Sequence, residues 1–417
     1  MRILIYSYNY YPEPIGIAPL MTELAEGLVQ RGHHVRVVTA MPNYPERKIY
    51  PDYRGRMYTA EKRNGVHIQR CYVWIRPNPG LAARVLLDGS FVVLSFIQAL
   101  RGWRPDLILY TSPSLPAAVP VALLKLLYRC PTVLNLQDIL PEAAVQTGLI
   151  TNPVAIRVFE ALEAFCYGSA SHISVIAEGF RQNLLGKKVK NQKISIISNW
   201  VDVNFIRPLP KYDNAFRQRH GLGEKFVVLY SGNIARTQGI STIIRAAYKL
   251  KSVPEIAFVI VGEQSQLADL EKLRQEMDAN NVLLLPFAPR AELPEMLAAA
   301  DVGLIMQKRN VVGFNMPSKT QVLLASGRAI IASVPAEGTA AQAVRASGGG
   351  VVVEPERPVA LADAIFDLYN HPEKVQMLGQ QGRQHALEHY SFEQALNRYE
   401  KLFGQMTTVP KATATVF

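Results

Sequence analysis

The sequence predicts an α/β protein built from two doubly wound parallel-sheet domains, and three observations carry this prediction. Short apolar runs rich in β-branched residues alternate with segments whose apolar residues repeat at helical spacing. The alternation stops at a segment rich in proline and charge, residues 208–223, and then restarts. The 417 residues are enough for two or three domains of roughly 150 residues each. Such alternation is typical of a parallel sheet that helices cover on both faces.

The first half contains five runs of strand length, each followed by turn residues and a helical pattern. These runs are residues 2–6, 35–39, 107–110, 132–136 and 172–176. The apolar repeat over residues 17–28 predicts the first helix, and Gly32 supplies its stop. A last strand near Ile194 leads into the proline-rich segment, so we expect the first domain to span residues 1–205.

The second half repeats this arrangement and ends in helices. Its predicted strands are residues 226–230, 257–261, 282–285, 302–305 and 329–333. We expect this domain to span residues 206–385, a helix over 386–405 to return to the first domain, and the Thr/Ala/Pro-biased residues 406–417 to form a flexible tail. Two such domains joined by one linker predict a central cleft at the carboxyl ends of both sheets, where open α/β sheets bind ligands.

The charge balance narrows the class of partner. The chain carries 45 Lys and Arg against 34 Asp and Glu, a formal net charge of +11, which points to an anionic partner. No basic run with interleaved aromatic residues appears, so nucleic acid is not the expected partner. The three cysteines cannot build a disulfide framework and no signal-peptide pattern opens the chain, so we expect a cytoplasmic location.

Two apolar stretches, residues 85–100 and 115–128, fall short of the roughly 20 clean apolar residues that a membrane-spanning helix needs. Buried core helices are the first interpretation. A surface that faces an anionic membrane is the alternative, because basic residues stand at the edges of both stretches. These residues are Arg84, Arg101, Lys125 and Arg129.

The first strand-to-helix loop, residues 10–19, contains a single glycine, Gly16. The absence of Gly-x-Gly-x-x-Gly argues against a dinucleotide-binding fingerprint at this place. Gly16 and Ile17 still open a helix, where a substrate could approach backbone N–H groups. A simple turn glycine between two prolines is the alternative.

Carboxylates follow two other predicted strands. Asp138 and Glu142 are four residues apart, where a helix would bring both to one face to accept a proton or hold sugar hydroxyls. A helix N-cap with a first-turn glutamate is the alternative. Glu263 occupies a similar place at the rim of the predicted cleft. His385 and His389 could ligate a metal from one helix, but no third ligand is evident, so we expect no metal site.

The corresponding loop of the second half, residues 230–239, offers permissive backbone at Ser231 and Gly232 and a fork of hydrogen-bond donors at Arg236. Ser318 reads as an N-cap, and Lys319 then falls in a first helical turn, where its charge opposes the helix dipole unless an anion is bound. Arg236 and Lys319 together could neutralise a pyrophosphate without a metal. A solvated surface charge is the alternative for each.

Read together, the motifs form a recognisable series. It includes Tyr-Tyr-Pro-Glu-Pro-Ile-Gly-Ile-Ala-Pro (10–19), Gln-Asp-Ile-Leu-Pro-Glu (137–142), Asn-Trp-Val-Asp (199–202), Tyr-Ser-Gly-Asn (230–233), Ala-Asp-Val-Gly-Leu (300–304) and Pro-Ser-Lys (317–319). Over about residues 1–405 the chain resembles retaining glycosyltransferases of family four with the two-domain GT-B fold, whose domains are Rossmann-like. Within that family it is similar to the branch of colanic-acid glycosyltransferases and O-antigen fucosyl- or N-acetylfucosaminyltransferases.

The resemblance implies transfer of a sugar from a nucleotide donor held by the second domain to an acceptor held by the first, with retention at the anomeric carbon and without a metal or other cofactor. Basic side chains and helix N-termini stabilise the leaving diphosphate in such enzymes. It implies three groups of site residues. They are Asp138, Arg236 and Lys319 for catalysis, Ser231, Gly232, Asn233, Gln238, Glu263 and Ser318 for the donor, and Gly16, Ile17 and Glu142 for the acceptor.

The sequence departs from the wider family at several of these places. Asn233 and Gln238 stand where Arg and Lys are frequent in the donor loop, Val322 stands where a glutamate is common, and Gln137 replaces a frequent histidine. The paired glutamates eight residues apart are missing. Positive charge for the diphosphate therefore has to come from Arg236 or Lys319.

The leading hypothesis is a glycosyltransferase that adds a deoxyhexose such as fucose, or an N-acetylhexosamine, to a polyprenyl-diphosphate-linked oligosaccharide in exopolysaccharide or O-antigen assembly. We expect it to contact the cytoplasmic face of an anionic inner membrane. A nucleotide-sugar epimerase of the same two-domain shape is one alternative. A catalytically silent sugar-nucleotide-binding partner is the other, because the usual glutamates are absent.

Overall fold

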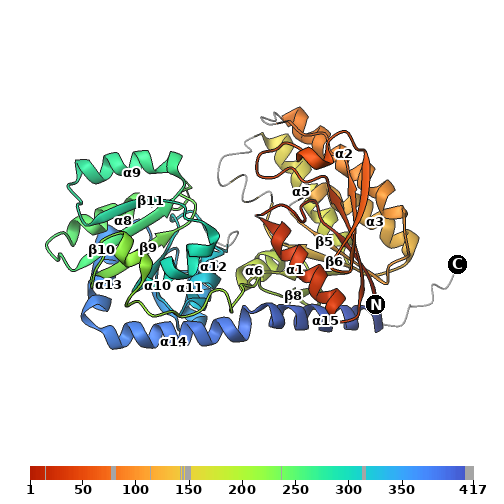
Figure 1. Cartoon of the computed structure of the whole chain (residues 1–417). Helices are drawn as coiled ribbons and strands as arrows, with labels where there is room; N and C mark the ends of the chain where they lie inside the picture. Colours follow the sequence, from red (N-terminus) through yellow and green to blue (C-terminus); the bar gives the residue numbers. More distant parts are fainter. Residues whose placement is uncertain are drawn as a thin grey trace. The chain divides into compact units, whose positions relative to one another are not determined.

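The computed structural model describes residues 1–408 apart from residues 15, 77–80, 113, 141, 143–144, 146–151, 236 and 312–315 (Figure 1). The chain divides into two compact units. The N-terminal unit contains Met1–Ile176, Arg181–Ile197 and the chain from Leu396 onward. The C-terminal unit contains Ala177–Phe180 and Ser198–Ala395.

Eight strands form the sheet of the N-terminal unit. They are β1 (Arg2–Tyr6), β2 (His34–Ala40), β3 (Tyr58–Arg63), β4 (Val66–Cys71), β5 (Leu107–Thr111), β6 (Thr132–Leu136), β7 (His172–Val175) and β8 (Ile194–Ile196). Their order is β3-β4-β2-β1-β5-β6-β7-β8. Every neighbouring pair is parallel except β3 and β4, which pair antiparallel. The predicted α/β class is confirmed, but this sheet is mixed where a parallel one was expected.

The hairpin of β3 and β4 was missed by the sequence analysis. Asn64 and Gly65 connect the two strands with φ of 46° and 83°. A two-residue connection with positive φ at both positions twists in the same sense as the flanking strands, and Asn-Gly is its most frequent sequence. The signal was therefore present in the sequence. The charged run Glu61, Lys62 and Arg63 on β3 is typical of an edge strand.

Helices cover both faces of this sheet (Figure 1). On one face lie α1 (Ile17–Gln30) and most of α15 (Phe392–Thr408), and on the other lie α2 (Leu81–Leu100), α3 (Ala118–Tyr128) and α5 (Pro153–Ser169). From β1 the chain moves to β2 toward one edge of the sheet, whereas from β4 to β5 and in the connections after β5 it moves toward the other edge. Because each crossover is right-handed, α1 lies on one face and the helices of the later connections lie on the other. In the described part of the chain, no helix is long and apolar enough to cross a membrane.

The last helix belongs to both units. Residues 392–395 of α15 are part of the C-terminal unit, and the residues from 396 onward are part of the N-terminal unit. The Asn135 amide of β6 donates a hydrogen bond to the Tyr399 hydroxyl, and Glu400 lies 2.9 Å from the Nε2 atom of His33. Phe403 is fully buried. These contacts hold the end of the chain to the N-terminal sheet.

The sheet of the C-terminal unit is entirely parallel. Its strands are β9 (Phe226–Ser231), β10 (Ile256–Gly262), β11 (Val282–Pro286), β12 (Val302–Met306), β13 (Ala329–Ser333) and β14 (Gly350–Val353), in the order β11-β10-β9-β12-β13-β14. The helices around it are α8 (Ser241–Lys249), α9 (Gln264–Glu276), α10 (Leu293–Ala298), α11 (Lys319–Ala325), α12 (Thr339–Ser347), α13 (Pro358–Asn370) and α14 (Pro372–His389). Five of the six strands were predicted. β14, a short run after Gly348 and Gly349, was not.

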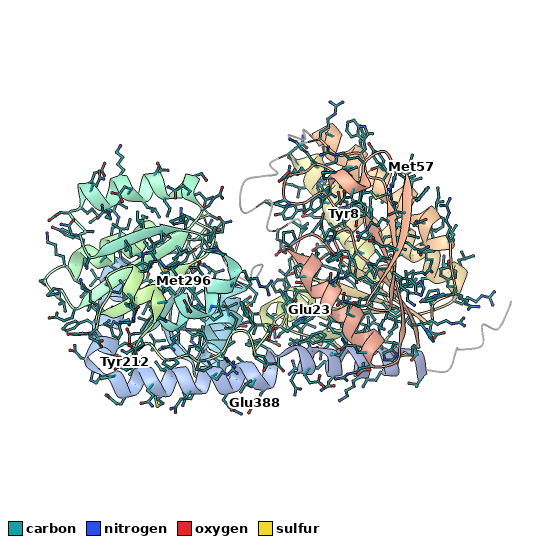
Figure 2. All side chains as sticks on the ribbon, viewed as in Figure 1. Tyr8, Glu23, Met57, Tyr212, Met296 and Glu388 are labelled. Carbon is teal, nitrogen blue, oxygen red and sulfur yellow. The ribbon has the colours of Figure 1, made fainter. Side chains whose placement is uncertain are left out.

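Two hydrophobic cores flank this sheet. Val227 and Leu229 of β9 belong to one core, and Val228 and Tyr230 belong to the other. Successive strand residues point to opposite faces, so an uninterrupted apolar strand supplies both cores at once. Figure 2 shows Met296, which is buried, within this unit, whereas Tyr212 is exposed.

The remaining elements are short. They are α6 (Glu178–Gly186), α7 (Ala215–Arg219) and the 3₁₀ turns η1 (Pro51–Tyr53), η2 (Leu115–Ala117), η3 (Asn191–Lys193) and η4 (Arg290–Glu292).

Candidate functional site

A pocket of about 410 Å³ lies beside the carboxyl end of β9 in the C-terminal unit. It brings together the loop after β9, the start of α11 and one side of α10. Six residues from the predicted catalytic and donor-binding groups line it: Ser231, Gly232, Asn233, Gln238, Ser318 and Lys319. The structure thus gathers into one pocket residues from two segments that are far apart in the sequence. Their role in donor binding stays a prediction.

The loop after β9 has its shape because of Gly232. This residue has φ of 146°, which side-chain-bearing residues rarely adopt. A Cβ atom here would lie 2.9 Å from the Nζ atom of Lys319, closer than real contacts allow. The Tyr230 hydroxyl donates a 2.7 Å hydrogen bond to the Asn233 carbonyl, which fixes the turn that follows. Glycine therefore lets the lysine side chain pass directly over the backbone.

Lys319 is the main positive charge of this pocket. Its Nζ atom is buried, has no hydrogen-bond partner among the described residues, and lies 3.8 Å from the centre of the Tyr230 ring. Burial lowers the pKa of Lys319 from 10.5 to about 7. An ammonium group without a counter-ion in such a place costs free energy, which an anionic ligand would recover. The lysine was predicted from the sequence, but the role of Tyr230, whose ring faces the lysine, was not.

The described lining of the pocket offers this lysine no carboxylate partner. None of the described residues that line the pocket is Asp or Glu. Val322, which stands where the related family often has a glutamate, is part of the lining and makes that wall apolar. The pocket therefore has a net positive field and suits an anion with an apolar or sugar portion beside it.

Three predictions on this side remain to be compared with the structure. Ser318 lines the pocket and occupies the predicted N-cap position of α11, but its side chain makes no capping hydrogen bond. Glu263 is exposed at the start of α9 and accepts a 2.9 Å hydrogen bond from Ser265 rather than lining the pocket. Arg236 lies outside the described residues.

In the N-terminal unit, Gly16 and Ile17 open α1 as predicted. Gly16 has φ of 71°, and a Cβ atom added to it would meet nothing within 4 Å. No side chain caps α1, and its first turn contains no acidic residue. The first backbone N–H groups of a helix have no partner within the helix, so this end can receive hydrogen-bond acceptors of a substrate.

Glu13, in the same loop, was not recognised from the sequence. Its side chain is buried; Oε1 accepts hydrogen bonds from the backbone N–H groups of Asn43 and Tyr44 at 2.8 and 2.9 Å, and Oε2 accepts one from Asn9 at 2.6 Å. This carboxylate ties the loop after β1 to the loop after β2. A single glutamate between two prolines belongs to no periodic sequence pattern that would indicate burial, so its role could not be predicted from the sequence.

Asp138 and Glu142 do not share a helical face. Residues 138–140 are not helical, so the expected helix does not begin at Asp138. Asp138 is exposed after β6, and partial desolvation raises the pKa of its carboxyl. Glu142 accepts a 2.7 Å hydrogen bond from Asn183 and lies 2.9 Å from the Lys187 ammonium. Asp138 thus stays available for a proton-accepting role, while Glu142 is held in an ion pair.

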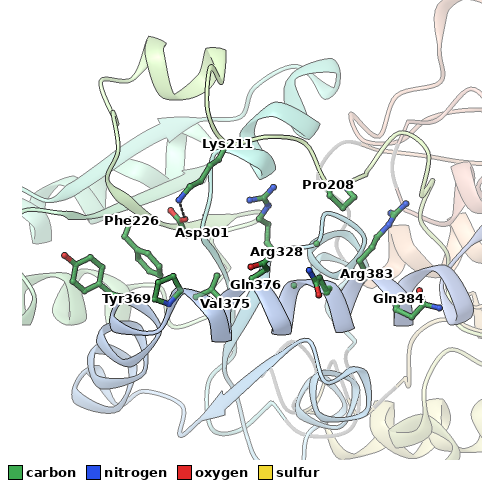
Figure 3. A pocket seen from close by; sticks show the side chains of 14 residues that line it. Pro208, Lys211, Phe226, Asp301, Arg328, Tyr369, Val375, Gln376, Arg383 and Gln384 are labelled. Carbon is green, nitrogen blue, oxygen red and sulfur yellow. Dashed lines mark hydrogen bonds and ion pairs between the residues drawn. The ribbon is translucent and has the colours of Figure 1, made fainter.

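A second pocket of the C-terminal unit, about 460 Å³, lies against α14 (Figure 3). Phe226 and Arg328 line it at the amino ends of β9 and β13, which is the edge opposite to the lysine pocket. Arg328 and Arg383 donate hydrogen bonds to backbone carbonyls, and Lys211 pairs with Asp301 at 2.7 Å. These charges cross-link chain segments and do not converge on a ligand, so we place the functional site at the lysine pocket.

Across the described residues, no three His, Cys, Asp or Glu side chains are grouped so that they could hold a metal ion. The ring centroids of His385 and His389 lie 4.3 Å apart, and the two rings are tilted by 37°.

Family models match both halves of the chain. A model described as a glycosyl transferase 4-like domain matches residues 16–200, and one for glycosyl transferases group 1 matches residues 213–385. The chain belongs to the glycosyltransferases of the family-four and group-1 type.

A relative with similarity over nearly the whole length comes from Escherichia coli strain K12. It is described as "Putative colanic acid biosynthesis glycosyl transferase WcaI" and is 32% identical over 373 residues, which is 88% of this chain and 91% of the relative. Among solved structures, sucrose-phosphate synthase from Thermosynechococcus elongatus has a TM-score of 0.73 at 18% identity and covers 97% of this chain and 98% of its own. HepE from Anabaena, in complex with UDP and glucose, has a TM-score of 0.69 at 17% identity over 97% and 100% of the two chains. These structures identify the fold as GT-B.

Proposed function

We propose that this glycosyltransferase transfers a sugar from a nucleotide-sugar donor, with retention at the anomeric carbon, to a polyprenyl-diphosphate-linked oligosaccharide. The sugar is a deoxyhexose such as fucose, or an N-acetylhexosamine, and the product enters exopolysaccharide or O-antigen assembly. Family membership and the description of the relative WcaI support the class of pathway. The observation that carries the donor assignment is the buried, unpartnered ammonium of Lys319 in a pocket whose described lining has no carboxylate.

In this proposal the donor diphosphate lies beside Lys319, and Ser231, Gly232, Asn233, Gln238 and Ser318 surround it. The bond between the anomeric carbon and the diphosphate oxygen breaks, and its electron pair stays on the diphosphate. Lys319 stabilises the negative charge that develops there. Stabilisation of developing charge by fixed groups is usually the largest single contribution to the rate enhancement of an enzyme. Arg236 would add a second positive charge. Because side chains supply this charge, we propose that no metal or other cofactor takes part.

The acceptor hydroxyl attacks the anomeric carbon from the face that the diphosphate leaves, and its proton passes to a diphosphate oxygen. The new glycosidic bond therefore keeps the configuration of the donor. We assign acceptor binding to the opening of α1 at Gly16 and Ile17 and to Glu142. We assign to Asp138 the positioning of the attacking hydroxyl, whose proton the diphosphate takes. The raised pKa of the Asp138 carboxyl agrees with such a role.

A lipid-linked acceptor implies a place of action. We propose that the enzyme lies on the cytoplasmic face of an anionic inner membrane as a peripheral protein.

The two alternatives make different demands on the pocket. An epimerase needs acid and base groups at the sugar, and the described lining supplies no carboxylate or histidine. A silent nucleotide-sugar-binding protein would need the same cation but would turn nothing over.

The test is nucleotide release from UDP-, GDP- and dTDP-sugars, with and without lipid-linked acceptors. We expect release with one donor only when an acceptor is present, together with a product whose anomeric proton coupling matches the donor. Conversion of a donor without acceptor would favour the epimerase. Binding without any turnover would favour the silent protein.

A further inference from the structure

Three adjacent helices of the N-terminal unit expose large apolar side chains to solvent. α2 contacts α3, and α3 contacts α5. The exposed residues are Val85, Leu86, Val93, Ile97 and Leu100 on α2, Val119, Leu123, Leu126 and Leu127 on α3, and Val154, Val158 and Phe165 on α5. We call these residues the aliphatic face.

On each helix the exposed residues form one stripe. Spacings of three, four and seven residues, as in Val93, Ile97 and Leu100, place side chains on a single helical face. The opposite faces of the same helices are buried in the core, for example at Phe91 and Leu124. These helices therefore bury one apolar face and leave a second one in water. A soluble monomer seldom leaves so large a contiguous apolar area uncovered, so we expect something to cover it.

Basic residues border the aliphatic face. A pocket of about 710 Å³ lies along the flank of α5 and is lined by Lys187, Lys188, Lys190 and Lys193. Lys187 is neutralised by Glu142 and Glu163, at 2.9 and 2.6 Å. Lys188 and Lys190 are exposed and form no ion pair within the described part of the chain.

A further basic residue lies at the end of α3. Arg129, just after the last residue of α3, is exposed. On α5, Ala164 and Gly168 line the lysine pocket and lie next to the stripe of Val158 and Phe165 on the helical surface. Positive charge thus stands beside the aliphatic face rather than within it.

We propose that the aliphatic face, with Lys188, Lys190 and Arg129 at its edge, docks on an anionic lipid bilayer. Aliphatic side chains suit acyl chains, and lysine and arginine beside them suit lipid phosphates. A protein interface core would be richer in aromatic side chains, and Phe165 is the single aromatic residue of this face. The inference deepens the proposed function, because a polyprenyl-linked acceptor resides in such a bilayer, but its test needs no sugar substrate.

The first experiment is flotation of the full chain with vesicles of phosphatidylethanolamine containing one third phosphatidylglycerol. Leu126→Asp with Val158→Asp should lower the partition coefficient by about tenfold or more. Both positions are well exposed, at 73% and 54%, so the fold should tolerate the change. The matched control, Val359→Asp with Met377→Asp, alters exposed apolar positions of the C-terminal unit, at 53% and 48%, and should leave partitioning unchanged.

The second experiment removes the edge charges. Lys188→Gln with Lys190→Gln should weaken binding to the anionic vesicles by about fivefold per charge and reduce its salt dependence. Binding to pure phosphatidylcholine vesicles should not change. Lys249→Gln with Lys272→Gln in the C-terminal unit is the control.

Three results would overturn the proposal. They are failure of the unaltered chain to bind anionic vesicles, unchanged binding by the Leu126/Val158 variant, and a dimer that this variant dissociates, which would show that a second copy covers the face. Binding of nucleoside diphosphate, measured by calorimetry without vesicles, should be the same in all variants. Loss of that binding in the unaltered chain would contradict the proposed function and leave the docking surface standing.

Discussion

Lys319 is both charged and buried, and these two properties oppose each other in an unliganded protein. It is a charged side chain whose Nζ atom is buried without a hydrogen-bond partner among the described residues, and the Tyr230 ring faces it. A cation over an aromatic face gains on the order of 1–2 kcal/mol when desolvated, which is less than burial of the charge costs. The site is thus unfavourable for stability and favourable for an anionic ligand.

Replacement of this lysine should therefore stabilise the chain. Lys319→Met keeps an unbranched side chain as far as the Cε position and removes the buried ammonium, so we expect the free energy of unfolding at pH 7 to rise by about 1–3 kcal/mol. In the unaltered chain the folded state, with a Lys319 pKa of about 7, binds fewer protons than the unfolded state, with a pKa of 10.5. Its stability should rise as pH increases from about 7 to about 10.

Urea unfolding at pH 7 and pH 9.5 provides the measurement. The advantage of Lys319→Met should shrink at the higher pH, because the unaltered lysine is then neutral in the folded state. Lys249→Met at an exposed position is the control and should show no such trend. An equal or lower stability of Lys319→Met at pH 7 would count against a buried unpaired charge.

Binding of a nucleoside diphosphate should draw a proton onto the same lysine. An adjacent diphosphate raises the pKa of Lys319, so at pH 8 we expect uptake of up to about one proton per bound nucleotide. Affinity should fall as pH increases above about 7. Calorimetry in two buffers of different ionisation enthalpy measures the uptake, and Lys319→Met should abolish it. Equal heats in both buffers for the unaltered chain would contradict the assignment.

Gly232 makes this arrangement possible. Gly232→Ala forces a side chain into a conformation with φ of 146° and places its Cβ atom against the Lys319 ammonium. We expect a loss of about 1–3 kcal/mol in unfolding free energy and on the order of tenfold in nucleotide affinity. Gly186→Ala, at a glycine whose added Cβ meets nothing within 4 Å, is the control for both measurements. Unchanged nucleotide affinity in Gly232→Ala would show that the close contact between the Gly232 backbone and Lys319 does not contribute to nucleotide binding.

At the scale of elements, Glu13 joins the loops after β1 and β2 at the carboxyl edge of the N-terminal sheet. Its two oxygens accept three hydrogen bonds from the other loop and from its own. Glu13→Gln should cost about 1–3 kcal/mol, because the new amide N–H₂ cannot accept one of them. Since these loops border the opening of α1, we expect the KM for acceptor to rise and nucleotide affinity to stay the same.

The exposed neighbour Glu46 offers the matched control. Glu46→Gln should change neither the stability nor the KM for acceptor. A change in nucleotide affinity in Glu13→Gln would place the loop junction on the donor side instead.

The elements also show what sequence patterns determine. The apolar runs of both sheets were predictable because fully buried parallel strands leave uninterrupted hydrophobic segments, as in Val227–Tyr230. The hairpin at Asn64-Gly65 was predictable too, but its strands carry charge and lack that signature. The helix that was expected to begin at Asp138 does not begin there, because residues 138–140 are not helical. Glu142 instead contacts Asn183 and Lys187, and such tertiary contacts cannot be predicted from the spacing of residues in the sequence.

The pocket itself was partly predictable. Lysine in a first helical turn, against the helix dipole, indicated a place for an anion, and the structure adds that its ammonium is buried over Tyr230. That burial depends on Gly232 and on a distant loop, and pairings between remote segments leave no trace in a single sequence. Arg236, predicted beside it, stays a prediction.

Across the whole molecule, the excess of positive charge has two proposed uses. In the C-terminal unit Lys319 receives a diphosphate, and in the N-terminal unit Lys188, Lys190 and Arg129 border a face for anionic lipid. A net charge of +11 alone could not separate these uses, because both partners are phosphates. The proposed function joins them, because in it one phosphate belongs to the donor and the other to the membrane of the acceptor.

The most direct test of this account is sugar transfer by the unaltered chain and by Lys319→Met, with the donor panel and polyprenyl-diphosphate-linked acceptors. We predict transfer from one nucleotide sugar by the unaltered chain. For the variant, which should be at least as stable, we predict a loss of about two orders of magnitude or more in kcat/KM. Transfer by Lys319→Met at the unaltered rate, or no transfer from any donor by the unaltered chain, would contradict the account.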